Sequence, residues 1–153
     1  HEIPAIRTMK ADIIVPALFP DEHFDLIVAN FSLHHSLPAH RQWTSKDEVN
    51  KELLRMFNNL KCYLTKGGQI VLREMSGMNF WRFMPYRWKV SHIDWDIHPL
   101  RRQWIVAMQK AGFREVCCSF LTPFFLSQWP SFLVRNRFAS FFCSSTFYLY
   151  GTK

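Results

Sequence analysis

Two short apolar segments on either side of a helical pattern constrain the fold of this chain most strongly. The first, FDLIVANF over residues 24–31, is nearly continuous in apolar residues, and the second, Gln69–Met75, contains Ile70, Val71 and Leu72. Uninterrupted apolar strands are typical of parallel sheets with both faces covered. A strand, a helix and a strand in this order form a right-handed crossover, and ligands bind where its strands end. We therefore predict an α/β fold with its site at that edge.

The helix between these strands has the clearest local pattern in the chain. Ser45 and Glu48 form a capping-box pattern at its start, and Gly67 and Gly68 supply the residues at which a helix stops. Apolar residues recur at helical spacing along one face: Val49, Leu53, Met56, Phe57, Leu60 and Leu64. We predict that the helix ends at the glycine pair.

The second half of the chain predicts a further helix and two strands. Pro99 occupies the position of a first helical residue, and Gly112 stops this helix. Its apolar face consists of Leu100, Trp104, Ala107, Met108 and Ala111. Residues 115–121 and 146–150 are β-branched and aromatic enough to form strands, with a lid or an antiparallel connection between them. Residues 78–96 have no clean period, so we expect a loop or irregular helix over the opening.

Charge and cysteine content give broader expectations. The 153 residues contain 19 Lys and Arg against 12 Asp and Glu, a formal charge of +7. These basic residues are scattered, which favours a solvated basic surface over a nucleic-acid-binding arm. The cysteines form no C-x-x-C pair: Cys62, Cys117, Cys118 and Cys143. We therefore expect no disulfide framework and a reducing, cytoplasmic setting.

One uncharged stretch, Val116–Val134, approaches the length of a membrane span. Pro123 and Pro130 interrupt it, so we predict no transmembrane segment. An interfacial membrane anchor flanked by Arg135 and Arg137 stays an alternative.

Four metal-ligand residue types alternate over a short segment: His92, Asp94, Asp96 and His98. Their spacing is not that of a known metal site. We expect a solvated loop or the rim of a pocket, and no metal.

Three segments resemble the class I S-adenosylmethionine (SAM)-dependent methyltransferases, in particular the methyltransferase type 11 or UbiE-like group. They are ADIIVPALFPDEHFDLIVANFSLHH (Ala11–His35), LLRMFNNLKCYLTKGGQIVLRE (Leu53–Glu74) and HPLRRQWIVAMQKAGFREV (His98–Val116). Ser145–Lys153 matches the closing strand of that family. The resemblance implies a partial Rossmann-like fold of parallel strands, crossover helices and a C-terminal antiparallel strand, with SAM as the cofactor.

The resemblance also implies roles for individual residues. Asp12 would accept a hydrogen bond from the adenine amino group, and Ile13 would pack beside the adenine ring. The methionine and sulfonium side of the cofactor would be lined by Asn30, Phe31 and Ser32. His34 and His35 would lie in the pocket, where either would assist deprotonation of an acceptor or simply pack. Methyl transfer depends mainly on alignment, so we assign no catalytic base.

The first 66 residues contain no glycine, so the G-x-G-x-G turn of the family is missing, as is the acidic residue that holds the ribose. We expect residues 1–153 to be one N-terminally incomplete methyltransferase domain whose exposed sheet edge is covered by a second copy or a partner. Aromatic residues over 80–95 and 120–142 suggest a small, partly apolar methyl acceptor. The alternative is a non-catalytic interaction module or a fragment of a longer methyltransferase.

Overall fold

A computed structural model of the chain describes residues 19–37, 46–84, 95–121, 128–143 and 145–153. Four strands form one sheet in the order β1-β2-β4-β3. Their bounds are β1 Phe24–Asn30, β2 Leu64–Met75, β3 Arg114–Phe120 and β4 Thr146–Thr152. β1 runs parallel to β2, whereas β4 runs antiparallel to both β2 and β3. The predicted parallel pair and the C-terminal antiparallel strand are both confirmed.

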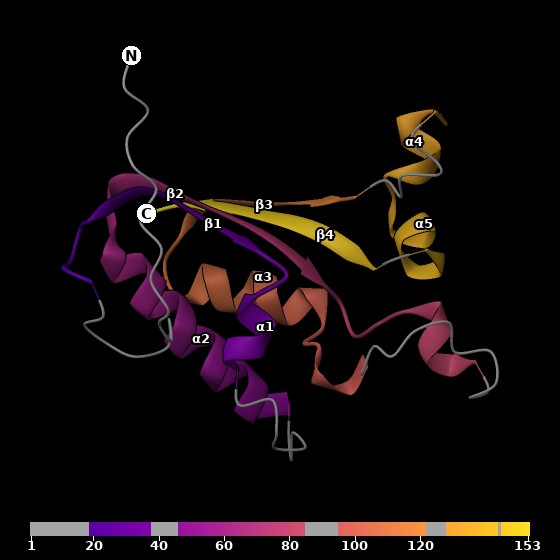
Figure 1. The fold of residues 1–153 in the computed structure, drawn as a ribbon, viewed down its shortest axis with the longest axis horizontal. Coiled ribbons are helices and arrows are strands. Elements are labelled where there is room, and N and C mark those ends of the chain that lie inside the picture. The colour runs from indigo at the N-terminus through magenta and orange to yellow at the C-terminus, as the bar shows by residue number, and fades with distance from the viewer. Residues whose placement is uncertain (1–18, 38–45, 85–94, 122–127, 144) are drawn as a thin grey trace.

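Helices α1, α2 and α3 cover one face of this sheet (Figure 1). The described helical elements are α1 Leu33–Ser36, α2 Lys46–Tyr63, η1 Phe80–Phe83, η3 Trp95–Ile97, α3 Arg101–Lys110, α4 Ser131–Val134 and α5 Arg137–Phe142. The short helices α4 and α5 lie beyond the end of β3 (Figure 1). None of the described helices is long and apolar enough to cross a membrane.

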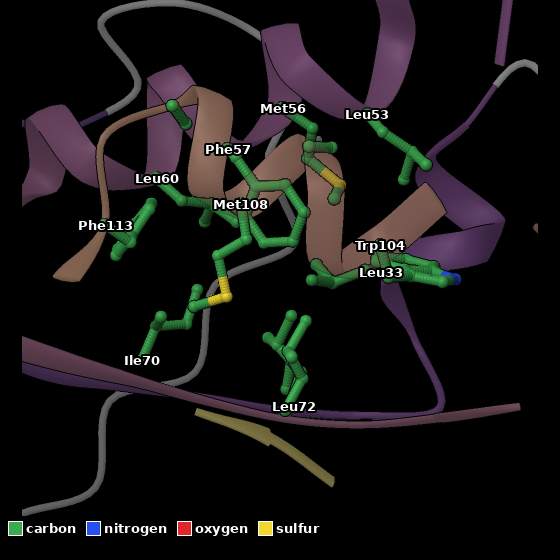
Figure 2. Packing of buried hydrophobic residues seen from close by; sticks show 14 of the residues in the cluster. Leu33, Leu53, Met56, Phe57, Leu60, Ile70, Leu72, Trp104, Met108 and Phe113 are labelled. Carbon is green, nitrogen blue, oxygen red and sulfur yellow. The ribbon is translucent and has the colours of Figure 1, made fainter. Parts of the chain in front are cut away.

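The core lies between the sheet and helices α2 and α3. Ile70 and Leu72 of β2 point toward side chains of both helices (Figure 2). The side chains buried there come from the apolar faces predicted for the two helices and include Leu53, Met56, Phe57, Leu60, Trp104 and Met108. Burial of these faces is what fixes the helices on the sheet.

The boundary between α2 and β2 differs from the prediction. The helix ends at Tyr63, and Gly67 and Gly68 lie inside β2 instead of stopping the helix. The pairing with β1 is irregular here, because Phe24 pairs with Leu64 whereas Leu26 pairs with Gln69. Gly67 has φ +80, which a residue with a side chain rarely adopts, so a glycine is favoured where the pairing is irregular. Ser45 of the predicted capping box lies outside the described residues.

Helix α3 begins at Arg101, two residues after Pro99. Leu100 has an extended backbone, and its N–H donates to the Gln103 side chain over 2.8 Å, which caps the helix instead. Gly112, with φ +78, follows the end of the helix as predicted.

The prediction that β1 is buried on both faces is wrong for the part of the chain that is described. Leu26 and Val28 are 53% and 65% exposed, whereas Ala29 between Val28 and Asn30 is buried. The described helices α1–α3 all lie on the other face of the sheet (Figure 1). Alternate apolar residues of β1 are therefore exposed to solvent. All four cysteines are free thiols, as expected.

Candidate functional site

The candidate site lies at the edge where β1 and β2 end. Asn30, the last residue of β1, pairs with Arg73, so both strands end at the same edge. Of the predicted cofactor residues, Asn30 and Ser32 are exposed there and Phe31 is partly buried. Asp12 and Ile13 lie outside the described residues, so their adenine-binding role stays a prediction.

Phe31 has an unusual backbone conformation at this edge. Its φ is +50, in the left-handed region that a bulky residue rarely occupies. The Phe31 N–H donates to the Arg73 carbonyl over 2.7 Å, and the Arg73 guanidinium lies 4.6 Å from the centre of the Phe31 ring. These contacts hold the chain as it turns sharply out of β1. Such strained residues are found most often at functional sites.

A buried histidine and glutamate pair follows directly after this turn. Nδ1 of His34 lies 2.7 Å from Oε2 of Glu74, and both side chains are almost fully buried. Oε1 of Glu74 accepts a hydrogen bond from the Leu33 N–H over 2.9 Å. Both carboxylate oxygens are therefore used to fix the first residues of α1 against the end of β2.

Further rings lie close to His34. Its ring centroid is 4.0 Å from that of His35 and 4.4 Å from that of His98. The ring centroids of Trp95 and His98 are 6.2 Å apart. The backbone carbonyl oxygens of the same two residues lie close to Gly77. Elements that are far apart in the sequence, α1 and the segment before α3, thus meet at the end of β2.

This arrangement suits proton transfer or orientation by His34. When Nδ1 carries the proton, it donates to the Glu74 carboxylate and leaves Nε2 as an acceptor. His35 is exposed, and no hydrogen bond joins its ring to a carboxylate among the described residues. Of the two histidines named from the sequence, His34 is therefore the stronger candidate.

Sequence reasoning assigned no role to Arg73 or Glu74, although both lie in a segment that carries the resemblance. Two adjacent charged residues at the end of an otherwise apolar strand are the sequence signal that would have pointed to a role for them, because buried charges need partners. Among the described residues no group of three or more His, Cys, Asp or Glu side chains could hold a metal ion. His92 and Asp94 lie outside that part of the chain, so the absence of a metal stays a prediction.

Comparisons with known proteins give similarity in structure alone. No protein-family model matches the chain. No curated protein matches its sequence.

Several solved structures share its fold. A SAM-dependent methyltransferase from Archaeoglobus fulgidus has a TM-score of 0.57 at 12% identity, covering 95% of this chain and 66% of the other. One from Mesorhizobium loti has a TM-score of 0.57 at 14% identity, covering 95% and 68%. Phosphoethanolamine N-methyltransferase 2 of Haemonchus contortus, in complex with SAM, has a TM-score of 0.54 at 14% identity, covering 88% and 34%.

The chain thus spans about two thirds or less of the length of these structures. The similarity to these structures and the mixed sheet seen here agree with the partial Rossmann-like fold predicted from the sequence. The chain therefore has the fold of the class I SAM-dependent methyltransferases.

Proposed function

We propose that this protein takes part in SAM-dependent methyl transfer to a small, partly apolar acceptor at the edge where β1 and β2 end. The observation that supports this most is the strained turn at Phe31, followed at once by the buried His34–Glu74 pair. Proteins of this fold that bind SAM have their site at the carboxyl ends of the parallel strands. The cytoplasm is the proposed location.

The residues at the edge suit the cofactor chemically. Nε of Arg73 is buried and has no hydrogen-bond partner among the described residues, so it can donate to the carboxylate of SAM. The exposed amide of Asn30 and hydroxyl of Ser32 can bond the same amino-acid end. Asp12 and Ile13 are proposed for the adenine. The cofactor supplies a methyl group on a positively charged sulfur.

The chain's own residues would orient the acceptor and move its proton. Glu74 holds the His34 ring through Nδ1, which leaves Nε2 able to accept a proton from an acceptor hydroxyl or amine. The turn at Phe31 places Ser32 and α1 over the end of the strand. Methyl transfer gains most from alignment of the two reactants, and a rigid edge supplies this.

Calorimetric titration of the purified chain with SAM and S-adenosylhomocysteine tests the proposal. We expect saturable binding that Asp12→Ala and Arg73→Gln each weaken about tenfold, the loss of one charge-assisted hydrogen bond. Asp21→Ala, which removes an exposed acid, and Arg55→Gln on α2 are the charge-matched controls. A folded chain that binds neither compound would contradict the proposal that these residues form a working cofactor site.

A non-catalytic interaction module is the second candidate function. The exposure of Leu26 and Val28 on one face of β1 favours it, because contiguous exposed apolar residues often mark a contact surface. A second copy of the chain is the partner we propose for this face. Absence of SAM binding together with self-association would favour this candidate.

A further inference from the structure

A cavity of about 560 Å³ lies between the end of β2, the start of α3, the end of β3 and helix α5. Its size is typical of pockets that take small organic ligands. The aromatic part of its lining includes Phe120, Phe138 and Phe141. An apolar ligand body would fit against these rings.

Three arginines also line this cavity, Arg101, Arg102 and Arg137, and the described lining contains no acidic residue. Arg101 lies with its guanidinium 4.5 Å from the centre of the Phe120 ring, so that its cation is held against the aromatic wall. None of the three forms an ion pair with a described carboxylate. Clustered cations that have no counter-charge among the described residues give the cavity a positive potential.

The thiol of Cys118 on β3 responds to the same charge. Burial raises the pKa of Cys118, and the nearby Arg101 guanidinium opposes that rise by favouring the thiolate. The raised pKa keeps Cys118 a neutral thiol near neutral pH, so Cys118 does not offset the charge of Arg101.

Hydrogen bonds within the protein fix the part of the cavity wall that lies between the end of β2 and the start of β4. Ser76 accepts from the backbone N–H groups of Arg101 and Met78, each over 3.2 Å. Buried Asn79 donates to the Ser145 hydroxyl over 2.8 Å, and that hydroxyl donates to the Met78 carbonyl over 2.7 Å. This network holds the start of α3 and places Arg101, which lowers the entropy cost of binding.

We propose that this cavity binds an amphipathic anion, namely an apolar molecule that carries one carboxylate. This binding does not depend on the proposed methyl transfer. Arg101 and Arg137 would hold the carboxylate, because a guanidinium matches its planar geometry. The phenyl rings of the lining would cover the apolar body.

Calorimetry with 4-phenylbutyrate, 4-phenylbutanol and 4-phenylbutyl phosphate, each titrated without SAM, tests this inference. We expect the carboxylate to bind at least tenfold more tightly than the alcohol and the affinity to fall with added salt. Arg137→Gln, a change at an exposed position of α5, is expected to weaken carboxylate binding about tenfold. Arg55→Gln removes the same charge from α2, outside the cavity, and is expected to leave binding unchanged.

Each other outcome overturns part of the inference. Equal binding of the alcohol, or no binding of any probe, would exclude an anion site, and tighter binding of the phosphate would exclude the commitment to a carboxylate. Arg101→Gln provides a second variant that must also weaken binding, with circular dichroism as the check on folding. Carboxylate binding by a chain that does not bind SAM would contradict methyl transfer alone, whereas the reverse result would contradict the anion cavity alone.

Discussion

Glu74, near the end of the central strand β2, connects this strand to the start of α1. Its two oxygens accept from the Leu33 N–H and contact Nδ1 of His34, and its side chain is fully buried. A buried carboxylate is costly unless its hydrogen-bonding capacity is used, so these two contacts are needed for Glu74 to be tolerated. The same contacts set the orientation of the His34 ring.

Replacement of Glu74 by alanine is expected to lower the free energy of unfolding by about 3 kcal/mol, because it leaves two buried donors without acceptors. Glu74→Gln keeps the size and one acceptor oxygen, so we expect a smaller loss. Urea denaturation measures both. Glu52→Ala breaks a partly exposed pair with Arg55, and we expect it to cost less than about 1 kcal/mol. Equal losses for Glu52 and Glu74 would contradict the structural role of the buried pair.

Elements were easier to predict than their ends or contacts. The periods of α2 and α3 and the apolar runs of β1 and β2 follow from local sequence, and each agrees with the structure. The start of β2 does not follow from local sequence, because it pairs irregularly with β1, a strand that is distant in the sequence. For the same reason the contact between His34 and Glu74, forty residues apart, was not visible in the sequence. The cavity combines α3, β3 and α5, whose packing no local pattern specifies.

Gly77 lies just after β2, where the chain leaves the sheet and contacts the segment before α3. A Cβ atom there would clash with the His98 carbonyl oxygen and would lie 2.8 Å from the Trp95 carbonyl oxygen. Both are backbone atoms, so the segment itself must move. We expect Gly77→Ala to lower the free energy of unfolding by about 2 kcal/mol in urea denaturation.

Gly77→Ala is also expected to weaken binding of 4-phenylbutyrate to the cavity, since the displaced segment carries His98 and leads into Arg101. Gly67→Asn is the control, because Gly67 has open space around it and asparagine tolerates a positive φ. A Gly77→Ala protein as stable as the control would show that the close approach seen here is not required.

At the scale of the molecule, the described residues cover the two faces of the four-stranded sheet unequally. Helices α1–α3 pack on one face, whereas Leu26 and Val28 of β1 and Tyr150 of β4 are exposed. β1 is also an edge strand among the described residues, and an edge strand presents unpaired backbone groups. Exposed apolar side chains beside an open edge favour association with another chain.

We therefore expect the chain to self-associate through β1 as its concentration rises. Val28→Lys places a charge on this face and should lower the average mass measured by light scattering, as charged residues do on natural edge strands. Because Val28 is 65% exposed, the change should alter the free energy of unfolding by no more than about 0.5 kcal/mol. Leu133→Lys, at an exposed apolar position of α4 outside the sheet, should leave the mass unchanged. A monomeric wild-type chain at high concentration, or equal effects of both substitutions, would exclude β1 as the contact surface.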